Sequence, residues 1–276
     1  MKYRIVADSS ADLITAGDRS VVSVPLKIVT DKKEYIDDEN LDVGGMTEEL
    51  AAYHGKSGSA CPGVGDWLQA FGDADRVFCI TITSNLSGSY NSARVAKETY
   101  ESENPDKKVF VIDSLSAGPE LKLIKEKIEE LLAKGKSFEE VCDAVTEYQK
   151  STYLVFMLKS LTNLANNGRV SPAVAKIAGV LGIHVVGIAS EVGTLEQKGK
   201  SRGEKKAILS VWKQMKELGY KGGKVIIDHC FNEEAAKQLC ELIKSEFADA
   251  IVKIRITRGL CSFYAEQGGM LVGTEC

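Results

Sequence analysis

The segment VFCITITSNLSGSYNSA (residues 77–93) joins an apolar strand pattern to a cluster of hydroxyl side chains. β-Branched and aromatic residues in its first half favour a buried strand, and helical spacing follows Ser89. The free backbone N–H groups and the positive dipole end of a helix start favour an anion. Hydroxyls on Ser84, Ser87 and Ser89 add donors, so the segment predicts a carboxylate or phosphate site. The alternative is that one serine is an ordinary helix N-cap.

Two further strand patterns end in polar, hydroxyl-rich loops. The apolar run at residues 3–7 is followed by Asp8-Ser9-Ser10, and the run at 108–112 is followed by Asp113-Ser114-Leu115-Ser116. In an open α/β sheet the carboxyl ends of parallel strands gather at one edge, where ligands bind. We therefore expect the three loops to converge, although each is also a plausible helix-capping loop.

Strand and helix patterns alternate over residues 1–150, which predicts an N-terminal α/β domain with a parallel sheet and helices on both faces. Within it we predict one strand over residues 21–29, with Pro25 marking an edge or an irregular end, and a loop over residues 54–65. The alternation changes near residue 150. Residues 151–276 predict a second α/β domain with a mixed sheet, which would close a pocket against the first.

Composition excludes several classes of function. The net charge is −4 and basic residues are dispersed, which argues against a nucleic-acid surface. Seven cysteines without regular spacing predict reduced thiols in a cytoplasmic protein rather than disulfides or a zinc site. The longest apolar run, residues 177–189, is too short to span a bilayer. No metal-ligand spacing, P-loop or dinucleotide fingerprint occurs, so we expect no metal and no cofactor.

An enzyme is the alternative to a binding protein. His229 follows the apolar run at residues 225–227 directly after Asp228, and strand-end loops add Asp8 and Asp113. These groups would serve as acid and base on a small carboxylated or phosphorylated substrate. A binding protein would instead hold an anionic head group and bury an alkyl tail, gaining about 0.8 kcal/mol for each methylene.

Seven segments, in order along the chain, carry a family resemblance. They are ADSSADL (7–13), VPLKI (24–28), SACPG (59–63), ITSNLSGSYNSA (82–93), VIDSLSAG (111–118), NNGRVSPAVAKIAGVLGI (166–183) and SRGEKKAI (201–208). Together they resemble the DegV family of bacterial fatty-acid-binding proteins. The resemblance implies two α/β domains with a long-chain fatty acid such as palmitate at their junction, and a lipid carrier with no catalysis of its own.

The resemblance also assigns residues to the fatty-acid carboxylate. In the family it is held by a hydroxyl of a Thr-Ser-Gln-Pro loop and by the serine of a Leu-Ser-Gly turn. The matching residues are Ser59 and Ser87, with the backbone around Gly88, and Arg169 is a further candidate near the head group. The loop Ser59-Ala60-Cys61-Pro62 keeps the leading hydroxyl and lacks the family's next serine and glutamine.

Some family members present the bound acid to a kinase that phosphorylates the carboxylate. Basic residues matching Arg169 and Arg202 belong to the kinase-facing side, and a surface salt bridge is the alternative role for both. The family has a histidine close to the head group where this chain has Ala265, preceded by Tyr264. This departure argues against a kinase partner and leaves fatty-acid binding in place.

Overall fold

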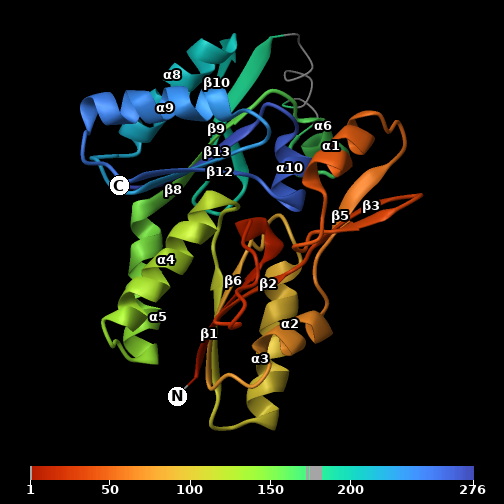
Figure 1. The fold of residues 1–276 in the computed structure, drawn as a ribbon, viewed down its shortest axis with the longest axis vertical. Coiled ribbons are helices and arrows are strands. Elements are labelled where there is room, and N and C mark those ends of the chain that lie inside the picture. Colours follow the sequence, from red (N-terminus) through yellow and green to blue (C-terminus); the bar gives the residue numbers. More distant parts are fainter. Residues whose placement is uncertain (1, 172–173, 175–181) are drawn as a thin grey trace.

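The computed structural model of the protein describes residues 2–171, 174 and 182–276. Two sheets lie one above the other along the long axis of the molecule, and a small third sheet projects from one side (Figure 1). The resembling segment at residues 166–183 falls partly outside the described residues. The fold is mixed α/β, as predicted.

The lower sheet has four strands, all parallel, in the order β2-β1-β6-β7. They are β1 (Tyr3–Asp8), β2 (Val21–Val24), β6 (Arg76–Thr81) and β7 (Lys108–Asp113). The helices around this sheet are α2 (Val64–Phe71), α3 (Ser89–Glu103), α4 (Pro119–Ala133) and α5 (Phe138–Tyr148), with the 3₁₀ turns η1 (Ser9–Ala11) and η2 (Gln149–Ser151).

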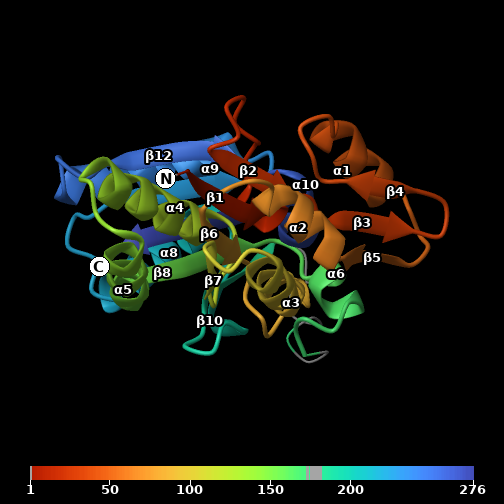
Figure 2. The same ribbon diagram turned by 90° about the horizontal axis from the view of Figure 1, so that it is seen from below.

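Successive side chains of β6 point to opposite faces of the lower sheet, as the pleat requires. Phe78 and Ile80 pack in one apolar cluster with α4 and α5, whereas Val77 and Cys79 pack with α2 and α3. Figure 2 shows the two helix pairs on either side of the sheet. The predicted parallel sheet with helices on both faces is therefore confirmed.

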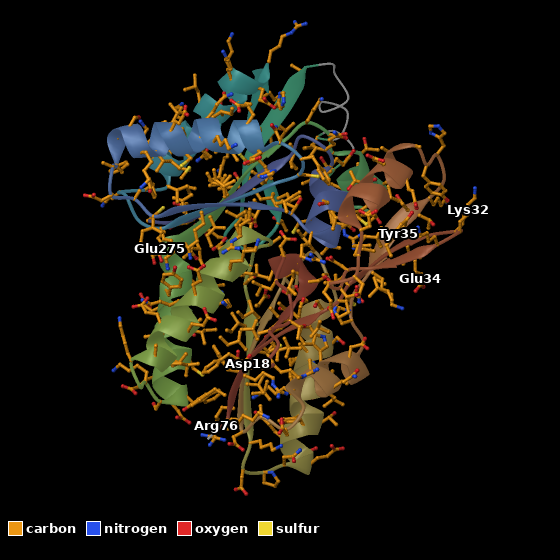
Figure 3. All side chains as sticks on the ribbon, viewed as in Figure 1. Asp18, Lys32, Glu34, Tyr35, Arg76 and Glu275 are labelled. Carbon is orange, nitrogen blue, oxygen red and sulfur yellow. The ribbon has the colours of Figure 1, made fainter. Side chains whose placement is uncertain are left out.

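The predicted strand over residues 21–29 is wrong in its continuity. The chain leaves the lower sheet after Val24, passes Pro25, and enters a separate antiparallel sheet of order β4-β3-β5. Its elements are β3 (Lys27–Thr30), β4 (Glu34–Ile36) and β5 (Ser57–Ala60), with helix α1 (Val43–Ala51) between β4 and β5. Lys32, Glu34 and Tyr35 lie on this outer arm (Figure 3). The loop predicted over residues 54–65 thus contains a strand, formed by pairing with β3 rather than by its own propensity.

The upper sheet has six strands in the order β10-β9-β8-β13-β11-β12. Only β11 and β12 pair in parallel among these neighbours, so the sheet is mixed, as predicted. The strands are β8 (Thr152–Leu158), β9 (Ile183–Ala189), β10 (Leu195–Arg202), β11 (Val225–His229), β12 (Val252–Ile256) and β13 (Met270–Glu275); the described helices are α6 (Thr162–Asn166), α8 (Glu204–Glu217), α9 (Glu233–Glu246) and α10 (Gly259–Ala265). The domain boundary near residue 150 stays a prediction.

The side chains of β8 alternate between the two faces of the upper sheet, and both faces are apolar. Val155 and Met157 are buried under α8 and α9, which cover the top of the molecule in Figure 1. Leu154, Phe156 and Leu158 point the other way and pack in a cluster that includes residues of α6 and α10. This second face looks toward the lower sheet and supplies one wall of a cavity.

Contacts of α4 and α5 join the two sheets. Lys122 donates to the Asp228 carboxylate at 2.6 Å, and Thr152 donates to Glu120 at 2.7 Å, both inside the protein. Tyr148 donates to Glu275, which lies near the end of β13 (Figure 3). Among the described residues no helix is long and apolar enough to cross a membrane, and no group of three metal-ligating side chains occurs.

Candidate functional site

A cavity lies between the lower face of the upper sheet and the loops at the carboxyl edge of the lower sheet, and its empty space, including open solvent at its mouth, is about 680 Å³. Most of its lining is aliphatic or aromatic and comes from strands and helices distant in sequence. The apolar lining includes Leu26, Ile82, Leu154, Phe156, Leu260 and Leu271. An apolar ligand can be buried against such a lining without leaving a polar group of the protein unpaired.

Among the described residues, four polar ones line the same cavity: Ser59, Ser87, Arg169 and Tyr264. The Ser59 and Tyr264 hydroxyls are hydrogen-bonded at 2.7 Å, which ties β5 to α10. The Arg169 guanidinium carbon lies 5.6 Å from the centre of the Tyr264 ring, a cation–π contact. The cavity therefore combines an apolar wall with a small group of hydroxyls beside a positive charge.

Ser87 lies just before α3, in the turn that follows β6. Its oxygen accepts a hydrogen bond from the Ser89 backbone N–H at 3.2 Å, which leaves its own proton free to donate. A β-carbon at Gly88 would lie 3.2 Å from the Cys61 sulfur, so the helix start and the loop after β5 approach closely there. Gly88 is exposed and lies outside the cavity lining, whereas Ser59, Ser87 and Arg169 are part of it.

Two other serines of these loops, Ser10 and Ser89, donate to a carboxylate that belongs to the protein. The buried Asp8 accepts hydrogen bonds from the Ser89 hydroxyl at 2.6 Å, from the Ile82 N–H at 3.0 Å and from the Ser10 hydroxyl. Burial raises the pKa of Asp8, and these hydrogen bonds oppose that rise. The strand-end loops converge, as predicted, but the Ser10 and Ser89 hydroxyls and the Ile82 N–H in them donate to Asp8.

Among the described residues, no hydrogen bond or salt bridge joins the three residues of the enzyme alternative to one another. Asp113 accepts from the backbone N–H groups of Ser84 at 3.0 Å and Leu115 at 3.2 Å, which shapes the loop after β7. The His229 Nδ1 accepts from the Asn232 N–H at 3.2 Å, and burial lowers the pKa of this imidazole. Asp8 accepts the hydrogen bonds described above. None of the three residues lines the cavity.

The comparisons with known proteins can be set against this geometry. The family model described as "Uncharacterised protein, DegV family" matches residues 2–273. The chain belongs to the DegV family. A DegV domain-containing protein of Streptococcus pneumoniae (strain ATCC BAA-255 / R6) is 45% identical over 279 aligned residues, which cover 100% of this chain and 99% of that protein.

Solved structures of DegV proteins share the whole fold. A DegV family protein from Eubacterium eligens loaded with heptadecanoic acid has a TM-score of 0.96 and 45% identity, covering 99% of each chain. The Streptococcus pneumoniae Fatty Acid Kinase (Fak) B3 protein loaded with linoleic acid has a TM-score of 0.97 and 45% identity, covering 100% of this chain and 99% of that one.

Within this DegV chain, Tyr264 is the polar cavity residue that the sequence did not single out as a ligand. In sequence it looks like one more aromatic on a buried apolar helix; the only signal was a phenol, whose hydroxyl needs a partner when buried. The neighbouring Ala265 is 3% exposed and lines the cavity without offering a donor. Arg202 is exposed at the end of β10, and no ion pair of its guanidinium occurs among the described residues.

Proposed function

We propose that this protein binds one long-chain fatty acid, with the carboxylate at Ser59 and Ser87 and the tail along the apolar wall. The observation that carries the proposal is the cavity itself, whose described lining is apolar apart from four polar residues. DegV relatives of the same fold hold heptadecanoic and linoleic acid, which supports the same ligand class.

The head group needs donors and a positive field, since a carboxylate only accepts hydrogen bonds. The Ser87 hydroxyl can donate its hydrogen at the start of α3, where the helix dipole adds positive potential. Arg169 adds a formal charge beside the hydroxyls; its Nη1 donates to the Asn167 carbonyl at 2.7 Å, and its other donors remain. A bond from a hydroxyl to a charged acceptor contributes about 1.5–3 kcal/mol.

The tail supplies most of the binding free energy. Each methylene buried against residues such as Phe156 and Leu271 contributes about 0.8 kcal/mol, so a chain of palmitate length gains on the order of 10 kcal/mol before ordering costs. The head group then fixes orientation and selects an acid. Because the tail supplies most of the binding free energy, few polar residues are needed at the head group.

In this proposal the protein carries the acid and performs no chemistry on it. A fatty-acid kinase is the partner to which it presents the carboxylate. The name of the Streptococcus pneumoniae neighbour supports this partner, whereas Ala265 in place of the family's histidine argues against it. The exposed Arg202 and the half-buried Arg169 are the contacts proposed for that partner. All seven cysteines are free thiols, which supports a cytoplasmic location.

Native mass spectrometry of the purified protein, followed by release of the bound molecule, tests the proposal. We expect one molecule of long-chain acid per chain, and uptake of added palmitate or oleate by delipidated protein. Absence of any long-chain acid, together with no uptake of either added acid, contradicts the proposal. Turnover of a small phosphorylated substrate, lost in His229→Ala, would favour the enzyme alternative.

A further inference from the structure

Tyr264 occupies a central position among the polar residues of the cavity. It contacts two of the other three, through the 2.7 Å hydrogen bond to Ser59 and the 5.6 Å cation–π contact with Arg169. Its ring also packs edge-on against Phe263, with the ring centres 4.8 Å apart. These contacts fix the ring, so the hydroxyl is held in one place instead of sweeping the cavity.

The phenol has a proton to give at neutral pH. Burial raises the pKa of Tyr264 above its ordinary value of 10, and this outweighs the opposite influence of Ser59 and Arg169. A phenol is a stronger acid than an alkyl hydroxyl and is the better donor of the pair. The favoured arrangement therefore has Tyr264 donating to the Ser59 oxygen, which directs the Ser59 proton toward the cavity.

We infer that Tyr264 is a positioning residue that, through Ser59, makes the cavity selective for an ionised carboxylic acid over neutral head groups of equal chain length. The inference rests on the proposed function, since it assumes that an alkyl ligand binds here. A chain of hydrogen bonds in which each hydroxyl polarises the next is stronger toward an anion than a lone serine is.

The chemistry of the ligand separates this role from simple packing. An alkanol accepts and donates weakly and gains little from a polarised hydroxyl, whereas a carboxylate gains in full. Loss of the Tyr264 oxygen should therefore weaken acid binding and leave alkanol binding unchanged. A residue that merely supported the fold would weaken both ligands equally.

The experiment measures dissociation constants of delipidated protein for palmitate and for hexadecanol. In Tyr264→Phe, which keeps the ring against Arg169 and Phe263, we expect palmitate to bind about tenfold more weakly and hexadecanol to change less than about twofold. Ser59→Ala should weaken palmitate binding, and Tyr264→Phe added to it should cause no further loss. Additive losses of palmitate affinity in the double variant would show that Tyr264 does not act through Ser59 and would overturn the inference.

Tyr100→Phe is the matched control, because its buried phenol donates at 2.7 Å to the Ala74 carbonyl in the core beneath α3. It should leave both dissociation constants unchanged. An unchanged palmitate constant in Tyr264→Phe, or equal losses for palmitate and hexadecanol, overturns the inference alone. If the wild-type protein binds neither ligand, the proposed function fails as well.

Discussion

Two groups of serine hydroxyls lie side by side at the carboxyl edge of the lower sheet, one bound to a carboxylate of the protein and one facing the cavity in which we propose that the fatty acid binds. In the first, Asp8 is fully buried and takes the hydroxyls of Ser10 and Ser89. In the second, Ser59 and Ser87 line the cavity and share their hydrogen bonds with uncharged groups. Ser87 and Ser89 are two residues apart in one motif, yet they belong to different sites.

The difference shows what turns a hydroxyl-rich loop into a binding site. Both sites use the start of α3 and serine side chains, so residue type does not distinguish them. What distinguishes them is whether a carboxylate of the chain already reaches the donors. Asp8 does so from the end of β1, so one group of hydroxyls is part of the core and the other faces the cavity.

Replacing Asp8 should give the largest effect, and the effect should be on stability. Asp8→Ala leaves two buried hydroxyls and the Ile82 N–H without their acceptor, which should lower the free energy of unfolding by about 3 kcal/mol or more. Chemical denaturation measures it. Asp8→Asn is the control, because an amide can accept from Ser89 and donate to Ser10, and it should cost much less. Equal losses of stability in the two variants would contradict the role of Asp8 as the acceptor of these hydrogen bonds.

Glu120 provides a second buried carboxylate that binds no ligand, and it should reveal itself through pH. Burial raises the pKa of Glu120 to about 7, so the native state holds the proton more tightly than the unfolded chain. Stability should therefore fall as pH rises from about 4.5 to about 7, by about 3 kcal/mol. Glu120→Gln should remove that loss, because the amide oxygen still accepts from Thr152.

Unfolding free energies of wild type and Glu120→Gln at about pH 4.5 and about pH 8 measure this difference. Parallel pH profiles of the two proteins would contradict the assignment. Palmitate affinity at the higher pH should be the same in both, because Glu120 lies outside the cavity lining.

Ser87→Ala and Ser89→Ala compare the two sites directly with the smallest chemical change. Ser87→Ala should weaken palmitate binding about tenfold or more, since it removes one donor to a charged group. It should lower stability by only about 0.5–1 kcal/mol, because it also removes the acceptor of the Ser89 backbone N–H. Ser89→Ala should lower stability by about 1–3 kcal/mol, because it removes a donor of buried Asp8. Titration of palmitate and thermal unfolding of both variants give the four values. Loss of binding in Ser89→Ala alone would reverse the assignment of the two serines.

The alternation of strands and helices was sufficient to predict the fold class, because it depends on side-chain period alone. Val77 to Ile82 has the β-branched and aromatic character of a buried strand, and β6 occupies the middle of the lower sheet. Pairing between distant segments was not predictable. Ser57–Ala60 has weak strand propensity and becomes β5 only because β3 offers it a partner. Pro25 follows the edge strand β2, as predicted, and the chain changes sheet there, which the sequence did not indicate.

The lining of the candidate site was predictable in part. The resemblance assigned Ser59, Ser87 and Arg169, and the structure brings all three to one cavity. It did not indicate Tyr264, since an aromatic residue on a buried helix has the same sequence signature whether it faces core or cavity. Nor could sequence separate Ser87 from Ser89, because their roles depend on the reach of Asp8 from another strand.

A crystal structure of the delipidated protein reloaded with palmitate tests the central claim most directly. The account predicts elongated density that starts at the Ser59 and Ser87 hydroxyls and runs along Leu154, Phe156 and Leu271, with Asp8 still bound to Ser89. Density that places the carboxylate elsewhere, or a palmitate soak that leaves this cavity empty while the acid binds at another surface, would contradict it.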